Sequence, residues 1–218
     1  MSTKHTVTQG ECFSSITKKF GFFDYKIIYD DAENSALKTK RPNPNVLFPG
    51  DIVAIPERQL KEEIGATLQK HIFKIPSKKT FIKVVIKDSE DKPYANIDYE
   101  LTVDGKKTTG KTDATGKVEE EIIADAKSGE IILRSKSGSN EILGVIELEF
   151  GKLAPAEENT GVQARLNNLG FDCGAVNGVM NTKTEEAIKA FQKKNGDPDT
   201  GVVDDTTRNK LLQQHDLE

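Results

Sequence analysis

The spacing of hydrophobic positions changes twice along the chain. Up to residue 60, short apolar stripes at helical spacing lie between two segments that read as short strands. Apolar and polar positions then alternate with a period of two, which is typical of strands, before helical spacing returns near the C-terminus. The pattern therefore predicts three modules and a linker: residues 1–60, linker 61–79, residues 80–152 and residues 153–218.

The first module is expected to contain two short strands and two short helices. Residues 5–8 are expected to form the first short strand, and a helical stripe from Phe13 to Phe20 ends at Gly21, where a C-cap glycine belongs. A second stripe covers residues 25–29. Residues 52–55 then form a strand that Pro56 stops, which gives the order β-α-α-β.

The middle module reads as a small antiparallel β-sandwich of five or six strands. Residues 97, 99, 101 and 103 place their side chains on one face, and Asp104-Gly105 follows as a hairpin signal. Ile142, Ile146, Leu148 and Phe150 are expected to share one face of the last strand.

The third module is expected to form three helices. Val162, Leu166 and Leu169 share one helical face that ends at Gly170. Residues 182–185 have the spacing of a capping box for the second helix, and Asp204 is placed to cap the third. The predicted fold class is thus multi-domain α+β.

Composition narrows the classes of function. The chain has 31 basic and 35 acidic residues, a net charge of −4, 35% hydrophobic residues and no Trp. This acidic balance argues against a nucleic-acid partner, and no run approaches the roughly 20 apolar residues of a membrane span. No signal peptide is visible behind Met1, so we expect synthesis in the cytoplasm. Two distant cysteines provide no disulfide framework.

No catalytic constellation emerges from the reactive residues. His5, His71 and His215 fall in separate segments without ligand spacing, so neither a metal site nor a cofactor is expected. Cys12 begins a helix, where a thiol pKa can fall, but a packing role fits Cys12 and Cys173 better. Residues 119–121 alternate faces and residues 185–186 open a helix, so these carboxylates do not converge on one bond. We therefore expect no enzyme.

The first module resembles a LysM domain, the small fold that binds glycans containing N-acetylglucosamine. The resemblance rests on the runs 5–12, 15–16, 20–21, 45–51 and 55–56, and the segment 30–41 departs from it by being longer and more charged. It implies a glycan groove lined by Gly10, Glu11, Cys12, Phe13, Asn45, Val46 and Leu47.

The third module resembles the helical peptidoglycan-binding domain type 1 over residues 160–213. The runs 161–171, 184–192 and 200–204 carry the likeness, and Asn177-Gly178 stands where the family usually has Asp-Gly. Asn177-Gly178 equally fits a tight turn that needs a positive φ. The resemblance, with polar groups beside an aromatic ring, implies glycan contacts from Phe171, Asn177, Gly178 and Thr184.

The middle module is similar to sandwich domains of the transthyretin or carboxypeptidase-regulatory kind, through the runs 92–97 and 112–116. The order of modules resembles that of proteins encoded beside spike components of bacterial contractile, type VI-like secretion systems. Together these likenesses imply a non-catalytic peptidoglycan-binding accessory protein, delivered to the periplasm or outside by such a system. The alternative is a spike or baseplate adaptor, or an effector-delivery protein, that uses its modules to contact a spike, hub or effector protein.

Overall fold

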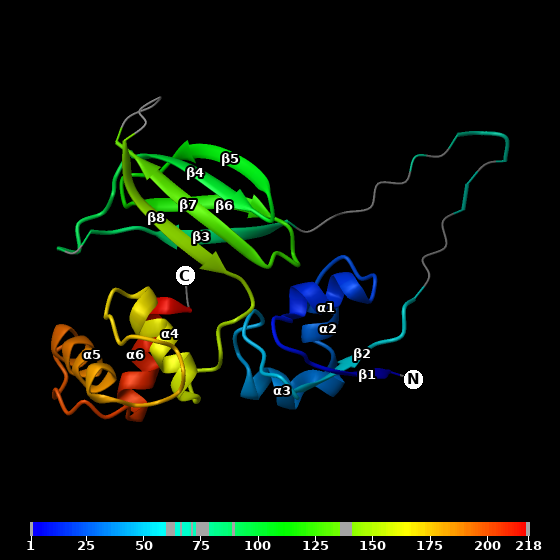
Figure 1. The fold of residues 1–218 in the computed structure, drawn as a ribbon. Coiled ribbons are helices and arrows are strands. Elements are labelled where there is room, and N and C mark those ends of the chain that lie inside the picture. The colour runs from blue at the N-terminus through cyan, green and yellow to red at the C-terminus, as the bar shows by residue number, and fades with distance from the viewer. Residues whose placement is uncertain are drawn as a thin grey trace. The chain divides into compact units, whose positions relative to one another are not determined.

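The computed structural model describes residues 2–59, 64–65, 67–70, 72, 79–88, 90–135 and 141–216. The predicted linker over residues 61–79 lies largely outside this set. The chain divides into two compact units, Met1–Asn45 with Pro49–Gly151 and Val46–Phe48 with Lys152–Glu218 (Figure 1). The fold is mixed α/β, with antiparallel sheets and a helical C-terminal unit, whereas the division into three modules stays a prediction. Within the described residues, no helix combines the length and apolarity needed to cross a membrane.

The first and last elements of the N-terminal part, β1 (Thr3–Thr6) and β2 (Ile52–Ile55), pair in a two-stranded antiparallel sheet. The chain between the two strands contributes Phe13, Ile16 and Ile28, which are completely buried, as the helical stripes predicted. The predicted order β-α-α-β is incomplete, because a 3₁₀ turn and a third helix follow the second. The helical elements are α1 (Phe13–Lys19), α2 (Lys26–Tyr29), η1 (Ala32–Asn34) and α3 (Ser35–Lys40).

Polar contacts at its two ends hold α3 in place. No residue of α3 is buried, so it carries no apolar stripe for sequence analysis to find. Before it, the buried Asn34 side chain donates to the carbonyls of Ile28 (2.8 Å) and Ala54 (2.7 Å) and accepts from the Ala54 N–H (2.8 Å). After it, buried Arg41 donates to Asp51 at 2.9 Å.

Six antiparallel strands follow, in two sheets with orders β5-β4-β7-β8 and β3-β6. β4 and β5 are joined by the predicted hairpin, in which Asp104 and Gly105 both have positive φ (44° and 82°). Side chains from both sheets form one hydrophobic cluster, including Val118 of β6 and Leu101 of β4. The strands are β3 (Thr80–Val85), β4 (Asp98–Val103), β5 (Lys106–Lys111), β6 (Lys117–Ile122), β7 (Ser128–Arg134) and β8 (Ile142–Glu149).

The prediction that Ile142 faces the core is wrong. Its residue is 52% exposed, whereas Ile146, Leu148 and Phe150 pack against the hydrophobic cluster as expected. The cause is a shift in register between β7 and β8, which inserts one extra residue between Ile142 and Gly144. A bulge of this kind reverses the alternation of faces beyond it, which a strict period of two does not anticipate.

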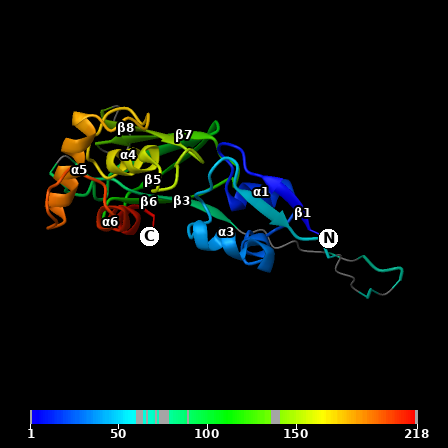
Figure 2. The same ribbon diagram turned by 90° about the horizontal axis from the view of Figure 1, so that it is seen from below.

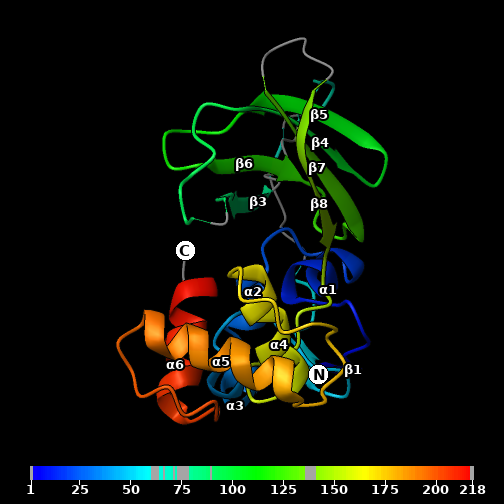
Figure 3. The same ribbon diagram turned by 60° about the vertical axis from the view of Figure 1, so that its left-hand side comes forward.

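The C-terminal unit contains three helices, as predicted (Figures 1 and 3). Asp204 caps the third helix by accepting from the Thr207 N–H at 2.7 Å. The predicted capping box of the second helix is wrong by one residue, because Asn181 is the N-cap and accepts from the Thr184 N–H at 3.1 Å. The helices are α4 (Asn159–Asn168), α5 (Thr182–Lys194) and α6 (Asp205–His215).

A buried ion pair joins the beginning of this unit to its end. Arg165 of α4 donates from Nε and Nη2 to the two carboxylate oxygens of Asp216, at 3.0 and 2.6 Å. Its Nη1 donates to the carbonyls of Ala154 (2.7 Å) and Gly161 (3.0 Å), so the guanidinium is extensively paired. Burial raises the pKa of Asp216, but hydrogen bonds from His215 and Arg165 outweigh it and hold that pKa below its usual value.

We expect Arg165→Met to destabilise the C-terminal unit by about 3–5 kcal/mol, because it removes the guanidinium that contacts both oxygens of the buried Asp216 carboxylate. Hydrogen exchange of the α4–α6 amides measures this loss. The control is Lys183→Met, which breaks an exposed pair with Asp172 and should cost no more than about 0.5 kcal/mol. Equal protection in the two variants would contradict the structural role of Arg165.

Candidate functional site

Among the described residues, the histidines and cysteines do not gather into one cluster. His5 pairs with Glu11 (2.8 Å) and His215 with Asp216 (2.7 Å), in different units, while His71 lies outside the described residues. In the described part of the chain, no three or more His, Cys, Asp or Glu side chains are grouped to hold a metal ion. Cys173 is buried as predicted, and burial raises the pKa of its thiol.

The carboxylates of β6 are each used locally. Glu120 accepts from the Tyr99 hydroxyl at 2.6 Å, whereas Glu119 and Glu121 pair with Lys117 and Lys79, both at 2.5 Å. Glu119 and Glu121 are exposed and Glu120 is half-buried, as alternation along a strand requires. They therefore do not converge on one point as a glycosidase pair would.

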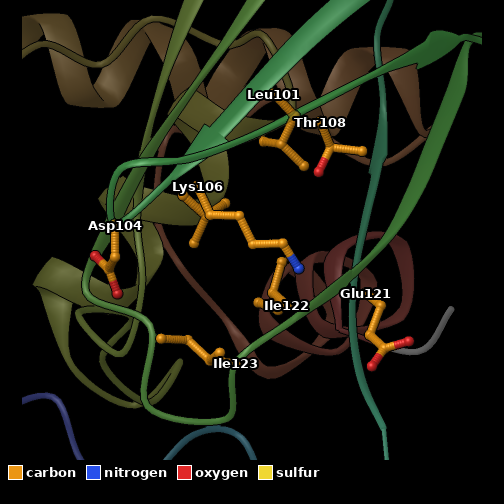
Figure 4. A pocket seen from close by; sticks show the side chains of 8 residues that line it. Leu101, Asp104, Lys106, Thr108, Glu121, Ile122 and Ile123 are labelled. Carbon is orange, nitrogen blue, oxygen red and sulfur yellow. The ribbon is translucent and has the colours of Figure 1, made fainter.

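A small cavity opens beside β4, β5 and β6 (Figure 4). Lys106 extends its side chain into it, toward Ile122. At its rim, the Asp104 carboxylate accepts hydrogen bonds from the backbone N–H groups of Lys127 (3.1 Å) and Ser128 (3.2 Å). The walls are mostly aliphatic and include no nucleophile beside a base, so this cavity offers no arrangement for catalysis.

The residues of the predicted LysM groove have unequal exposure. Phe13 is completely buried, so its assignment as a glycan contact is wrong for its side chain, which packs against Tyr29 instead. Its backbone N–H donates to the Pro44 carbonyl at 3.0 Å, which ties the two predicted groove loops together. The remaining groove residues divide into exposed Asn45, half-buried Gly10, Glu11 and Cys12, and buried Val46 and Leu47.

Glu11 has a structural role in the turn between β1 and α1. Its carboxylate accepts from the Thr8 N–H (2.8 Å) and from Lys19 (2.9 Å), and pairs with His5. Burial raises the pKa of this carboxyl, but hydrogen bonds from Lys19, Thr8 and His5 more than offset that effect and hold it at about 2. Glu11 is thus committed to contacts within the protein.

In the helical unit, one buried amide shapes the turn that carries Asn177. Gln163 of α4 is completely buried and accepts from the N–H groups of Asn177 (3.0 Å) and Gly178 (2.8 Å). It donates to the Val179 carbonyl (3.0 Å) and the Thr184 hydroxyl (3.3 Å). Gly178 has φ +80°, a conformation that favours glycine. We call residues 177–179 the first Gly-Val loop.

A second turn repeats these contacts. Gln192 of α5 accepts from the Gly201 N–H (3.0 Å) and donates to the Val202 carbonyl (2.9 Å) and the Thr207 hydroxyl (3.0 Å). Gly201 has φ +75°, and its turn likewise leads into the next helix through a side-chain cap at Asp204. We call residues 200–202 the second Gly-Val loop.

The two loops also expose matching side chains. The Val179 N–H donates to the Asn177 side chain (2.9 Å), and the Val202 N–H donates to the Thr200 hydroxyl (3.2 Å). Both valines are strongly exposed, at 58% and 65%. Each loop therefore displays a polar side chain, a glycine and a branched apolar side chain on a backbone held from beneath.

The predicted site residues of this unit separate into surface and interior. Asn177 is exposed and Gly178 is half-buried in the first Gly-Val loop. Thr184 is completely buried and its hydroxyl bonds within the fold, so its assignment as a glycan contact is wrong. Phe171 is half-buried with its ring 5.4 Å from that of Phe191, which makes it largely a packing residue.

Sequence reasoning missed Val179, Thr200 and Val202. An internal repeat in the sequence marks them. Gly178-Val179-Met180-Asn181 and Gly201-Val202-Val203-Asp204 are similar, and the last residue of each run lies three positions before a buried threonine. Comparing the module with itself would have found this repeat.

Residues 157–211 match the family described as "Putative peptidoglycan binding domain". This confirms the predicted likeness of the third module. The solved structure of SltB3 from Pseudomonas aeruginosa in complex with NAG-NAM-pentapeptide shares 29% identity with this chain, over 34% of this chain and 20% of that one, with a TM-score of 0.25. The chain thus spans about a fifth of the length of that protein. None of the curated proteins compared with the chain matches it.

We expect Glu11→Gln to lower the free energy of unfolding at pH 7, by on the order of 2 kcal/mol. The carboxylate has a depressed pKa in the fold, so its contribution is present above the unfolded value, about 4.3, and is lost as pH falls toward 2. The difference from the parent chain should therefore shrink between pH 4.5 and 2. Hydrogen exchange of the α1 amides across this pH range measures it.

The control is Glu33→Gln, which removes an exposed carboxylate from the same part of the chain. A stability difference for Glu11→Gln that stays constant from pH 7 to pH 2.5 would contradict the assigned role of this carboxylate.

Proposed function

We propose that this chain is a non-catalytic peptidoglycan-binding protein and that the two Gly-Val loops are its main glycan contacts. The observation that carries the proposal is the family match over residues 157–211, which contains both loops. Binding without catalysis fits the described residues, in which His5 and Glu11, His215 and Asp216, and Tyr99 and Glu120 are paired with each other and Cys173 is buried.

The chemistry of the loops suits a sugar polymer. Glycan recognition needs a shallow surface that combines hydrogen-bonding groups with apolar area. Val179 and Val202 supply exposed methyl groups for the apolar faces of sugar rings, and Asn177 and Thr200 supply polar groups beside them. Because the loops are held by buried glutamines, little conformational entropy is lost when they bind.

Two similar contacts on one domain also suit a repeating ligand. Each contact alone is weak, but a polymer that engages both gains through effective concentration, provided that its geometry allows both at once. The repeat in the protein thus parallels the repeat in a glycan.

For the N-terminal part, we propose a LysM-like module, followed by a β-sandwich of the transthyretin kind. The strand–helix–strand arrangement of β1 to β2 and the single hydrophobic cluster between the two sheets support these assignments. Any glycan contact here falls to Asn45, Gly10 and Cys12, because Phe13 is buried and Glu11 is internally paired.

The proposed site of action is the cell wall, reached from the cytoplasm with the help of a contractile secretion system. This rests only on the order of the modules. The rival proposal, an adaptor or effector-delivery protein whose modules contact a spike or hub protein, predicts no binding to isolated sacculi. Sedimentation with peptidoglycan therefore separates the two.

We expect Val179→Ser and Val202→Ser each to weaken co-sedimentation with purified sacculi about fivefold, equivalent to about 1 kcal/mol of lost apolar contact. The double variant should bind more weakly than either. Asn177→Ala should also weaken binding while the helices remain folded, because its side chain is exposed.

Val176→Ser is the matched control, because Val176 is also exposed (47%) but lies outside the loop. Wild-type binding by all the loop variants, together with loss of binding in Asn45→Ala, would move the contact to the first module. No sedimentation of the parent chain would refute the proposed function.

We further expect no soluble muropeptides when the chain is incubated with sacculi, since the structure gathers no acid, base and nucleophile in its described part. Chromatography of the supernatant measures release against a heat-inactivated sample of the same chain. Release above that level would show that the chain is an enzyme.

A further inference from the structure

The repeat in the helical unit extends beyond the two Gly-Val loops to one position on the helix before each loop. Thr160 of α4 lies three residues before Gln163, and Lys189 of α5 lies three residues before Gln192. Three residues are close to one helical turn, so each side chain lies one turn from the glutamine that holds the loop. Thr160 and Lys189 thus occupy equivalent positions with different chemistry.

Each of these side chains lies against the glycine of its loop. A Cβ atom on Gly178 would lie 3.5 Å from the Thr160 methyl carbon. A Cβ atom on Gly201 would lie only 2.9 Å from Cε and 3.3 Å from Cγ of Lys189. The Lys189 side chain therefore extends across the second Gly-Val loop, where the chain beyond α5 returns beside that helix (Figures 1 and 2).

Lys189 brings an uncompensated positive charge to the second loop. Its side chain is exposed, and it forms no hydrogen bond or ion pair with any described residue, including exposed Glu185 one turn earlier on α5. The equivalent position of the first loop is neutral, because Thr160 stands there and Asn159 beside it donates to the Gly178 carbonyl at 3.1 Å. The two loops therefore offer similar polar and apolar groups but differ by one charge.

Both loops contact the same helix. The first loop leads into α5 at its N-cap Asn181, whose N–H donates to the Val179 carbonyl at 3.0 Å. The second loop meets α5 at Lys189, which lies about 12 Å further along the helix axis. This axial separation suits a short oligosaccharide that contacts both loops.

We propose that Lys189 and the second Gly-Val loop form a subsite for a carboxylate on the peptide branch of peptidoglycan. This inference rests on the proposed glycan binding and assigns the neighbouring unsubstituted sugar to the first loop. Peptidoglycan alternates a neutral N-acetylglucosamine with a sugar that carries a peptide ending in a carboxylate. One ammonium group at one of two otherwise similar loops matches this alternation, and the Lys189 ammonium donates to the carboxylate in a charge-assisted hydrogen bond.

The test measures co-sedimentation of the full chain with three polymers. They are purified sacculi freed of other anionic polymers, the same sacculi with their carboxylates converted to methylamides, and chitin, which is a neutral polymer of N-acetylglucosamine. Lys189→Met removes the charge but keeps an unbranched side chain against Gly201, and Lys189→Arg keeps the charge. The control Lys193→Met makes the same charge change one turn further along α5, at another exposed lysine.

We expect Lys189→Met to weaken binding to native sacculi about two- to fivefold, the range of an exposed ion pair. Lys189→Arg and Lys193→Met should bind native sacculi as the parent chain does. Conversion of the carboxylates to methylamides should remove the advantage of the parent chain over Lys189→Met. All four proteins should bind chitin equally, because chitin offers no carboxylate.

Unchanged binding of Lys189→Met to native sacculi would overturn the subsite and leave the proposed function intact. Equal weakening of Lys189→Met on sacculi and on chitin would also overturn it, since Lys189 would then act without a carboxylate. An equal loss in Lys193→Met would assign the effect to a diffuse positive surface instead. A parent chain that does not sediment with sacculi would refute the proposed function itself, and the subsite with it.

Discussion

The loops of this protein depend on buried amide side chains that replace missing backbone partners. A buried N–H or C=O without a hydrogen bond costs about 1–3 kcal/mol, and thin cores cannot offset many such losses. Asn34 avoids this cost for the Ile28 carbonyl and for both backbone groups of Ala54 in β2. Gln163 and Gln192 avoid it for the two Gly-Val loops. Each of these amides is almost completely buried and uses both its donor and acceptor sides.

This arrangement has a functional consequence in the helical unit. Because the glutamines satisfy the loop backbones from the interior, the loops need no apolar anchor of their own. Val179 and Val202 can then remain on the surface, where a core-anchored turn would have buried them. A loop that is rigid and still exposes apolar area is suited to bind a stiff polymer, since neither partner has much conformational freedom to lose.

The sequence alone was sufficient to predict an element where one hydrophobic period or one turn type dominates the segment. Helical spacing identified α4 and α5, and Asp104-Gly105 identified the β4–β5 hairpin. It was insufficient where polar contacts or strand register determine the local structure. The helix α3 has no buried residue to mark it, and the bulge beside Ile142 depends on the pairing of β8 with β7. Thr184 is buried with its hydroxyl accepting from Gln163, a residue 21 positions away. Hydrogen bonds between distant residues leave no periodic trace in a single sequence.

The exposed apolar residues of this chain are not equivalent. Isolated apolar residues on a surface need no explanation, so Val176 alone indicates nothing. Val179 and Val202 differ because two independent turns with the same hydrogen bonds expose the same side chain. At both valines, exposure coincides with a loop backbone that a buried glutamine holds in place, and that coincidence makes the two Gly-Val loops candidates for recognition.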